Sequence, residues 1–408
     1  MRARSAASPV RLRVAVDAEP LYGHETGVGN FCRGLLSALA ASDALDLSAF
    51  AVTWRRQDQL VTLVPTGVTV RGRPMPARPL RGAWRRSNFP PIDLFLGPVD
   101  VVHGTNFVVP PTSTAARVVT VHDLVPVHFP EMCDHATINY PGLIRRALDG
   151  GAWVHTHSRF VAAEVVDEFK VDPARVRAIP SGIPDLDGHL GPGGAGLAAG
   201  SLPPGIHRYV LSIGTVEPRK DYASLVRAFD QIAPDQPDLG LVIIGADGWE
   251  ASAFARAMGM SSHRDRIVRP GYLDNQELAS WLRGAAVLAY PSRYEGFGYP
   301  PLQAMASSVP VVATKAGSLP EVLGDAAALV DVGDIDQLAA ALSAVLDDPD
   351  YAAALTNRGL RQVAEYSWER CALEMIDLYR TAAGPPRLRG RRAQAGAGSV
   401  TSAARSMT

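Results

Sequence analysis

The segment VLAYPSRYEGFGYPPLQ, residues 287–303, decides the fold. Its apolar beginning, residues 287–290, predicts a buried strand that ends at a proline. A loop containing two glycines follows, and either Pro300 or Pro301 suits the first helical position, where proline has no amide hydrogen to lose. This order of strand, loop and helix predicts that Glu295 lies at the carboxyl end of a strand and faces the start of a helix.

The predicted helix start is a candidate ligand site. It presents free amide donors and the positive end of the helix dipole, which favour an anion or hydroxyl groups. The amides of Gly296, Phe297 and Gly298 directly precede it, and Gln303 is expected in its first turn, facing the same pocket. The alternative is that Glu295 is an ordinary solvated loop residue.

Strand-like apolar runs alternate with helical patterns along the whole chain, which favours parallel sheets with helices on both faces. The expected strands form two series. The first comprises residues 12–17, 99–102, 118–121, 153–156 and 176–179, and the second comprises residues 209–213, 241–244, 267–269, 287–290, 311–313 and 327–330. The fold class is therefore α/β, with two domains of similar construction.

A segment rich in glycine and proline, residues 183–206, separates the two series and is interpreted as a linker. It divides an N-terminal domain, residues 12–182, from a C-terminal domain, residues 207–366. A last helix is expected over residues 367–383, with Trp368 and Tyr379 as candidate anchors or ordinary packing residues. A basic tail without acids, residues 384–408, is expected to be disordered, as is the short arm before residue 12.

The composition excludes several classes of protein. A chain of 408 residues with 47% hydrophobic content suits two packed domains, and a net charge of −1 does not indicate nucleic acid. The three cysteines lack the spacing of metal ligands and are interpreted as reduced thiols of a cytoplasmic protein. No apolar run approaches the length of roughly 20 residues that a membrane span needs.

Arg219 and Lys220 form the second candidate site. They follow the predicted strand 209–213 and Gly214, and open α/β sheets bind ligands at the carboxyl ends of their strands. A diphosphate leaving group can be neutralised by a metal held by acidic pairs, or by arginine, lysine and helix ends. This chain offers the second set, although an Arg-Lys pair is often just a solvated face.

Two further loops follow strands of the first series. The loop after residues 12–17 carries Gly27 and Gly29 before a helix, which suits close approach of a phosphate. His122 follows residues 118–121 and can reach the cleft, or it can be a satisfied histidine at the end of a strand. His103 and Asn106 occupy a similar position, where an acceptor-side and a structural role are equally open.

Two more groups of residues can be interpreted in more than one way. His155 and His157 share one face of an extended segment, but no third ligand is visible, so no metal site is expected. Residues 71–86 hold six arginines and no acid, with Trp84 among them. This patch is interpreted either as a contact for anionic lipid or an acidic acceptor, or as a solvated loop with one packed tryptophan.

The spacing of Glu295 and Gln303 resembles the signature of the retaining glycosyltransferases of family 4, in which two glutamates are separated by seven residues. The resemblance spans nearly the whole chain. It implies the GT-B fold: two Rossmann-like domains facing across a cleft, with a C-terminal helix crossing back to the first. Gln303 departs from the pattern, and the amide loses the charge-assisted part of a contact to ribose.

The resemblance also implies roles for the site residues. Arg219 and Lys220 would hold the donor phosphates, Glu295 and His122 would lie beside the donor sugar, and Gln303 would touch the ribose. The expected catalytic residues are therefore Arg219, Lys220, His122 and Glu295. The expected donor-binding residues are Gly27, Gly29, Gly214, Gly296, Phe297, Gly298 and Gln303, and the candidates on the acceptor side are His103 and Asn106.

The expected reaction is metal-independent transfer of a hexose from a nucleotide diphosphate sugar, without a separate cofactor. The sequence is most similar to members that use GDP-mannose, while UDP-glucose and UDP-N-acetylglucosamine stay open. The acceptor is expected to be a saccharide, a lipid-linked sugar or a small metabolite, and residues 71–86 suit contact with the inner face of a membrane. Two alternatives are a nucleotide-sugar epimerase on the same scaffold and a binder that lost catalysis at Gln303.

Overall fold

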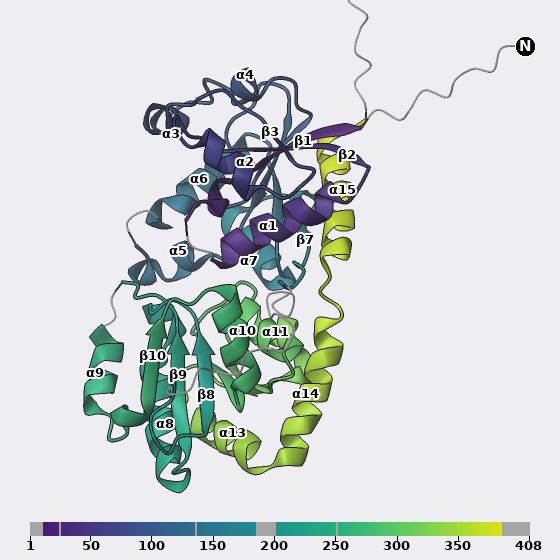
Figure 1. The fold of residues 1–408 in the computed structure, drawn as a ribbon. Helices are drawn as coiled ribbons and strands as arrows, with labels where there is room; N and C mark the ends of the chain where they lie inside the picture. The colour runs from purple at the N-terminus through teal and green to yellow at the C-terminus, as the bar shows by residue number, and fades with distance from the viewer. Residues whose placement is uncertain (1–10, 24–25, 135–136, 185–200, 250–251, 386–408) are drawn as a thin grey trace, which may run out of the picture.

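The computed structural model describes residues 11–23, 26–134, 137–184, 201–249 and 252–385 (Figure 1). The predicted N-terminal arm therefore lies almost wholly outside the described residues. The same holds for residues 185–200 of the predicted linker and for residues 386–408 of the predicted basic tail.

The N-terminal domain is built on a seven-stranded parallel sheet in the order β3-β2-β1-β4-β5-β6-β7. Its strands are β1 (Leu12–Asp17), β2 (Leu45–Phe50), β3 (Thr69–Val70), β4 (Val101–Gly104), β5 (Ala116–Thr120), β6 (Trp153–Thr156) and β7 (Val176–Ala178). Its helices are α1 (Gly27–Ala40), α2 (Gln57–Leu63), α3 (Ala77–Trp84), α4 (Asp93–Leu96), α5 (Val125–His128), α6 (Tyr140–Asp149) and α7 (Arg159–Phe169). Separate apolar cores fill the two faces of the sheet, as parallel sheets require.

The C-terminal domain repeats this plan with a six-stranded parallel sheet in the order β10-β9-β8-β11-β12-β13. Its strands are β8 (Arg208–Ile213), β9 (Leu239–Ile244), β10 (Ile267–Gly271), β11 (Val287–Tyr290), β12 (Val311–Thr314) and β13 (Ala328–Val330). Its helices are α8 (Tyr222–Ile232), α9 (Ser252–Met260), α10 (Asn275–Gly284), α11 (Tyr299–Ala306), α12 (Leu319–Leu323), α13 (Ile335–Asp347) and α14 (Pro349–Val363). Apolar cores again lie on both faces of the sheet. The prediction of an α/β fold with two parallel sheets is confirmed.

The strand order reverses between β1 and β4 in the first sheet and between β8 and β11 in the second. Loops that leave neighbouring strands at such a point diverge and form a crevice at the carboxyl ends of the strands. The loop with Arg219 and Lys220 follows β8, and the loop with Glu295 follows β11. The topology therefore brings the two candidate segments of the C-terminal domain together.

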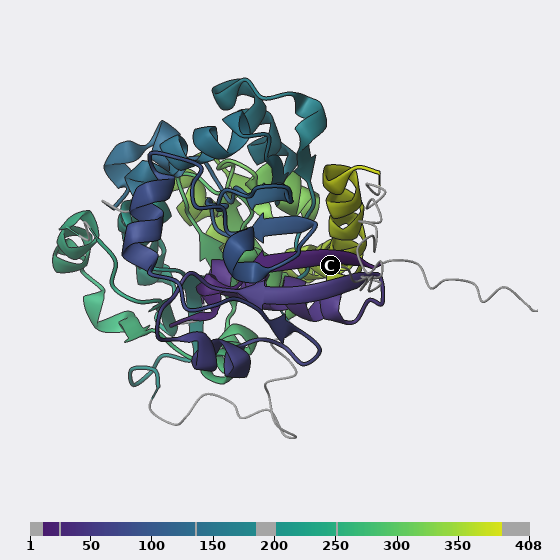
Figure 2. The same cartoon turned by 90° about the horizontal axis from the view of Figure 1, so that it is seen from above.

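The last helix, α15 (Trp368–Ala383), returns to the N-terminal domain and packs along α1 (Figures 1 and 2). Ser367 caps its first turn by accepting a hydrogen bond from the amide of Arg370. The indole of Trp368 lies directly against two glycines, Gly34 of α1 and Gly182. A Cβ atom built on either glycine would come within 2.4 Å of the ring. Tyr379 is buried near the other end of the helix and contacts His103. Both expected anchors therefore pack on the N-terminal domain.

Several details differ from the sequence-based expectations. Strands β2 and β3 were not predicted. The residues after Pro76 form helix α3 and not a loop, while Trp84 is packed as the second alternative for residues 71–86 expected. Helix α11 begins at Tyr299, so Gln303 lies at the start of its second turn and not in its first.

Candidate active site

Arg219 and Lys220 end a short 3-10 helix, Pro218–Lys220, in the loop after β8. Pro218 opens this turn, and Asp221 leaves it in the left-handed region with φ of 46°. The side chain of Asp221 then caps α8 by accepting a hydrogen bond from the amide of Ser224. A turn fixed at both ends holds the two cationic side chains at the carboxyl edge of the sheet.

Glu295 lies between these two cations. Its Oε1 atom is 2.7 Å from Arg219 Nη1 and 2.7 Å from Lys220 Nζ. Burial opposes ionisation of the carboxyl group, but Arg219 and Lys220 outweigh this effect and lower the pKa of Glu295 to about 2. The carboxylate is only 6% exposed, so the structure excludes the alternative that Glu295 is an ordinary solvated loop residue.

Two side chains that the sequence did not single out complete this cluster. Glu217 accepts a hydrogen bond from Arg219 Nη2, and Tyr290 Oη accepts one from Lys220 Nζ. Burial lowers the pKa of Lys220 although Glu295 opposes the shift, whereas the carboxylates of Glu295 and Glu217 raise the pKa of Arg219 despite its burial. The two cations are therefore surrounded by carboxylates, and an entering anion would compete with Glu295 and Glu217.

Glycines allow the segments around this cluster to approach closely. Gly214 has φ of 148° and accepts a hydrogen bond from Tyr222 Oη through its carbonyl. Gly298 has φ of 98° at the residue before α11. A Cβ atom at Gly296 would lie 1.9 Å from the carbonyl oxygen of His122, so only glycine permits this contact between the two domains.

Phe297 and Gln303 are both buried. The ring of Phe297 lies 5.6 Å from that of His157 and 5.2 Å from that of Tyr299, so it packs at the boundary between the domains. The carbonyl of Gln303 accepts a hydrogen bond from the amide of Ser307 within α11. Gln303 thus lies on the helix that starts directly after the Glu295 loop.

His122 lies in a chain of hydrogen bonds whose direction is determined by its ends. Its Nε2 atom is 2.8 Å from the carbonyl of Thr105 and must therefore donate. The Nδ1 atom then accepts from His157 Nε2 at 2.8 Å, and His157 Nδ1 accepts from the hydroxyl of Ser181 at 2.7 Å. Burial lowers the pKa of His122 to about 4, so the ring is neutral near pH 7. Both ring nitrogens of His122 already have protein partners.

A second chain of hydrogen bonds accounts for His103. The hydroxyl of Tyr379 lies 2.8 Å from His103 Nδ1, and His103 Nε2 lies 2.8 Å from Thr120 Oγ1. Thr120 in turn lies 2.9 Å from His155 Nδ1, and His155 Nε2 donates to the carbonyl of Ile179 at 2.9 Å. His103 is 0% exposed, so the structure favours the structural alternative and contradicts direct contact of this side chain with an acceptor.

His155 and His157 are members of these two chains of hydrogen bonds. Across the described residues, no group of three or more His, Cys, Asp or Glu side chains is placed to hold a metal ion.

Gly27 and Gly29 occupy the first turn of α1, where the hydroxyl of Thr26 accepts a hydrogen bond from the amide of Gly29 at 3.2 Å. A Cβ atom at Gly27 would lie 3.6 Å from the ring of Tyr299, so this helix start faces the C-terminal domain. Asn106 follows β4, and its carbonyl accepts a hydrogen bond from the amide of Val108 at 2.7 Å. The structure therefore places Gly27 at the boundary with the C-terminal domain, against Tyr299.

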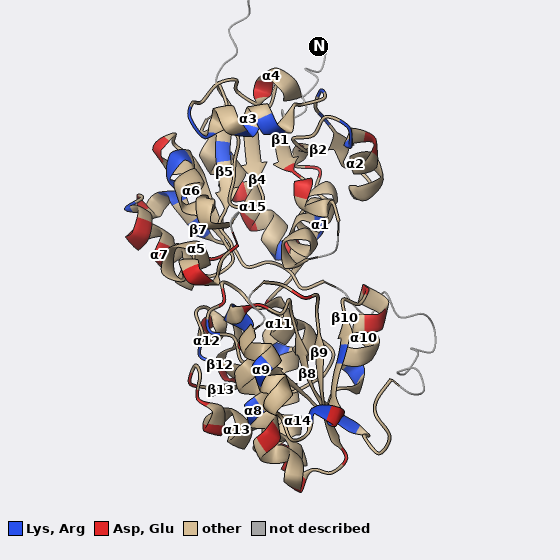
Figure 3. Ribbon diagram, turned by 90° about the vertical axis from the view of Figure 1, so that its left-hand side faces the viewer, with Lys and Arg blue, Asp and Glu red and all other residues tan. Residues whose placement is uncertain are grey.

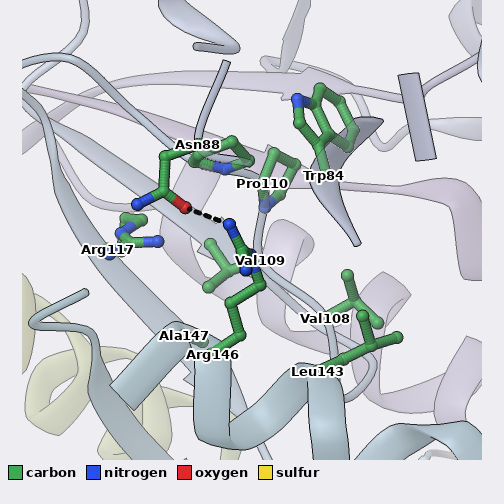
Figure 4. Close-up of a pocket in the computed structure, with 10 residues that line it drawn as sticks. Trp84, Asn88, Val108, Val109, Pro110, Arg117, Leu143, Arg146 and Ala147 are labelled. Atoms are coloured by element: carbon green, nitrogen blue, oxygen red, sulfur yellow. Dashed lines mark hydrogen bonds between the residues drawn. The ribbon is translucent and has the colours of Figure 1, made fainter. Parts of the chain in front are cut away.

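A cavity in the N-terminal domain lies apart from this cluster (Figure 4). It is lined by Trp84, Pro110, Arg117, Arg146 and other residues of the same domain. Its volume of about 30 Å³ suits a water molecule and not a sugar. It is therefore not a candidate for the substrate site.

Arginines of α3 lie on the outer surface of the N-terminal domain, where Figure 3 shows basic residues on this helix. Arg81 and Arg71 form ion pairs with Glu19 and Asp46. Trp84 packs inside, and its Nε1 atom donates to the carbonyl of Pro90 at 2.8 Å. Within the described residues, no helix has both the length and the apolar composition needed to cross a bilayer.

The arrangement of the two domains recurs in solved glycosyltransferases. Sucrose-phosphate synthase from Thermosynechococcus elongatus superposes with a TM-score of 0.70 at 24% identity, covering 91% of this chain and 99% of that one. WaaG, a glycosyltransferase involved in lipopolysaccharide biosynthesis, superposes with a TM-score of 0.65 at 15% identity and covers 90% of this chain and 99% of that one. The structure is therefore of the GT-B class, as the sequence resemblance implied.

Sequence comparison identifies the family within this class. The profile named Glycosyltransferase Family 4 matches residues 26–185, and the profile named Glycosyl transferases group 1 matches residues 200–362. The O-antigen chain mannosyltransferase B of Escherichia coli is 30% identical over 283 residues, which are 69% of this chain and 74% of that protein. The chain belongs to the glycosyltransferases of family 4.

A second relative matches over a shorter segment than the Escherichia coli protein but with a higher sequence identity. The GDP-mannose-dependent monoacylated alpha-(1-6)-phosphatidylinositol monomannoside mannosyltransferase of Corynebacterium glutamicum is 35% identical over 161 residues, which are 37% of this chain and 42% of that protein. The D-inositol 3-phosphate glycosyltransferase of Kineococcus radiotolerans is 30% identical, with 54% of each chain covered. The chain thus spans about half the length of these two relatives.

Proposed function

We propose that this glycosyltransferase transfers a hexose with retention at the anomeric carbon, and that a nucleotide diphosphate sugar is the donor. The observation that carries the proposal is the buried cluster in which Arg219 and Lys220 each lie 2.7 Å from Glu295 at the point where the strand order reverses. Two fixed cations at this point supply the positive charge that a departing diphosphate needs. Metal independence is part of the proposal because protein side chains provide that charge.

In the proposed reaction, the bond between the anomeric carbon and the diphosphate oxygen breaks while the acceptor oxygen attacks from the same face. The proton of the acceptor hydroxyl passes to the leaving phosphate, so no dedicated protein base is required. Arg219 and Lys220 stabilise the diphosphate, and Glu295 with the amides of Phe297 and Gly298 orients the sugar. His122 packs beside this loop, because its carbonyl lies against Gly296 and its neutral ring keeps its hydrogen bonds to Thr105 and His157.

GDP-mannose is the favoured donor. The Escherichia coli relative is a mannosyltransferase by name, and the Corynebacterium glutamicum relative is named as GDP-mannose-dependent. A carboxamide at Gln303 retains hydrogen bonding to a ribose but lacks the charge of the usual glutamate. We therefore expect donor affinity, more than reaction type, to differ from relatives with two glutamates.

The proposed acceptor is a saccharide, a lipid-linked sugar or a small hydroxyl compound bound mainly by the N-terminal domain. The basic surface of α3 suits peripheral contact with an anionic membrane, because its arginines lie near the exposed side chains of Phe89 and Leu94 in the sequence. A lipid-linked acceptor would be presented at such a surface.

The donor is tested by thermal shift with a panel of nucleotide diphosphate sugars. A ligand at 100 times its dissociation constant stabilises the folded protein by about 2.7 kcal/mol. GDP-mannose is expected to give the largest shift, and radiolabelled transfer then identifies the acceptor. Arg219→Ala and Lys220→Ala are each expected to lower kcat by about 10²- to 10³-fold, the effect of losing a donor that stabilises the transition state. Near-normal turnover in both variants would contradict the proposal.

A further inference from the structure

Tyr294, the residue before Glu295, extends from the catalytic loop into the N-terminal domain. Its hydroxyl donates to the carboxylate of Glu164 on α7 and accepts a hydrogen bond from the amide of Leu124 at 3.1 Å. Its ring is 4% exposed and packs against Phe129 and Phe160, with ring centroids 5.6 and 6.0 Å away. Every one of these partners belongs to the N-terminal domain.

The backbone of the same residue contacts Arg219, one of the two cations. The carbonyl of Tyr294 accepts a hydrogen bond from Arg219 Nη1 at 3.1 Å, and the amide of Arg293 donates to the carbonyl of Arg219 at 2.7 Å. The nitrogen that reaches this carbonyl is also the one that lies 2.7 Å from Glu295. A displacement of the Tyr294 backbone therefore displaces the guanidinium group that contacts Glu295.

Neighbouring contacts fix the loop at the same boundary. The hydroxyl of Ser158 donates to the carbonyl of Gly296 at 2.9 Å, and Gly296 lies directly against the carbonyl of His122. Glu164 is itself held by His128, whose Nε2 atom is 3.2 Å from the carboxylate. The partner of the Tyr294 hydroxyl is therefore an anchored group, so its hydrogen bond is sensitive to separation of the domains.

From these contacts we infer that Tyr294 is a positioning residue that couples closure of the two domains to the placement of Arg219. When the domains separate, the hydroxyl loses both partners and the N-terminal domain releases the loop. When they close, the hydroxyl fixes the loop, and the Tyr294 carbonyl fixes Arg219 toward the diphosphate. The inference rests on the proposed function in one respect, namely that Arg219 contacts the leaving group.

The test compares Tyr294→Phe with a matched control, Tyr209→Phe. The first variant keeps the ring and the backbone carbonyl and removes only the hydroxyl between the domains. The second removes a buried hydroxyl that donates to the carbonyl of Trp281 at 2.6 Å within the C-terminal domain. Both variants are expected to unfold at lower temperature than the wild type, and this common loss removes stability as an explanation.

Small-angle X-ray scattering, with and without GDP, measures domain closure, and steady-state kinetics with GDP-mannose measures turnover. In Tyr294→Phe we expect a larger radius of gyration and a kcat reduced about tenfold or more, since a hydrogen bond to a charged group is lost. Tyr209→Phe is expected to match the wild type in both measurements. Adding Glu164→Ala to Tyr294→Phe is expected to reduce kcat no further, because both changes remove one contact.

The inference requires that Tyr294→Phe show both a larger radius of gyration and a lower kcat. A larger radius of gyration with wild-type kcat overturns the coupling to Arg219. A reduced kcat with wild-type scattering, or a loss of kcat matched by Tyr209→Phe, overturns the coupling to closure. Failure of the proposed function has a different signature, because the wild-type enzyme itself would then turn over neither GDP-mannose nor UDP-glucose, whatever the scattering profiles show.

Discussion

The indole of Trp368 lies directly on Gly34, at a distance that leaves no room for a Cβ atom. An added Cβ would lie 2.1 Å from Cζ2 of the indole. Gly34 belongs to α1 of the N-terminal domain, and Trp368 is the first residue of the returning helix α15. This contact fixes where the C-terminal helix joins the first domain.

We therefore expect Gly34→Ala to lower the melting temperature, because the methyl group overlaps the indole. Trp368→Ala removes a large packed ring and is expected to lower the free energy of unfolding by about 3 kcal/mol. In the double variant, the methyl group of residue 34 meets empty space, so the combined loss is expected to be smaller than the sum of the two single losses. Chemical denaturation of all four proteins measures this difference, and strict additivity would show that the two residues are not in contact.

Glu295→Gln is expected to separate binding from transfer. The amide keeps the shape of the side chain but leaves Arg219 and Lys220 with an uncompensated positive charge, so the unliganded protein should be less stable by about 3 kcal/mol or more. The same excess charge should strengthen binding of GDP, whereas transfer should slow because the sugar is no longer oriented by a carboxylate. Calorimetry with GDP and a turnover assay measure the two effects. Weaker binding of GDP in the variant would contradict the competition between carboxylate and diphosphate.

The amino-acid sequence predicted several buried strands well, for a physical reason. Strands β1, β6 and β11 match the expected ranges to the residue, because each is a short, largely apolar run with a clear break at both ends. Strand β2 carries apolar residues at alternate positions, Leu45, Leu47 and Ala49, a signal that was missed, whereas β3 has only two residues. Their places in the sheet come from pairing with β1 and β2, which is a tertiary effect.

The site could be predicted only in part. Arg219, Lys220 and Glu295 stand out because each follows a predicted strand and belongs to a recognisable motif. His103 and His122 look alike in the sequence, since both follow strands of the first domain. Their difference arises from Tyr379, which lies more than 250 positions away and buries His103 with a hydrogen bond. Tyr294 gave no signal, because its role depends on partners in the other domain.

Glu321 offers a prediction about the boundary between the domains. Its carboxylate accepts hydrogen bonds from the amides of Arg159 and Phe160, each at 2.9 Å, and so caps α7 from the other domain. Glu321→Ala is expected to lower kcat about tenfold by disfavouring closure. The matched control is Asp334→Ala, since Asp334 caps α13 within the C-terminal domain. That variant should lose about 1 kcal/mol of stability and retain kcat. Equal kcat values for the two variants would contradict a role of Glu321 in closure.

The buried histidines predict a dependence of stability on pH. Burial lowers the pKa of His155 to about 4, below the value near 6.5 expected in the unfolded chain. The unfolded chain therefore binds more protons between pH 6.5 and 4, so stability is fully present above pH 6.5 and declines as the pH falls through this range. Each such histidine contributes a slope of at most about 1.4 kcal/mol per pH unit.

His155→Gln isolates this contribution, because glutamine retains a donor for the carbonyl of Ile179 but does not titrate. The difference between the variant and the wild type is measured at several pH values by urea unfolding. Taking this difference removes the contribution of other titrating groups to the pH dependence of stability. One such group is Asp17, whose pKa is raised by burial to about 7 and whose effect on stability has the opposite sign. The variant should be relatively more stable at pH 5 than at pH 7. A difference independent of pH would contradict a neutral buried His155.

Gln303→Glu tests the departure from the family pattern. A carboxylate at this buried position is expected to lower the melting temperature of the unliganded protein, since an ionised group is then buried without a fixed partner. If residue 303 contacts the ribose, the affinity for GDP should increase about tenfold through a charge-assisted hydrogen bond. Titration calorimetry measures the affinity for GDP. An affinity that the substitution leaves unchanged would contradict a contact between residue 303 and the ribose.

The position of Trp368 has a consequence for how the cleft opens. The chain passes between the domains near Gly182 and again before Trp368, and both passages touch the same indole ring. Because Gly182 and Gly34 both lie against Trp368, we expect the domains to rotate about an axis on the α15 side. The largest displacement of one domain relative to the other is then expected at the opposite side of the molecule, near α5 and α9 (Figure 1). At this rim Trp249 Nε1 donates to the carbonyl of Met132 at 3.0 Å. We therefore expect substrates to enter and products to leave by that rim.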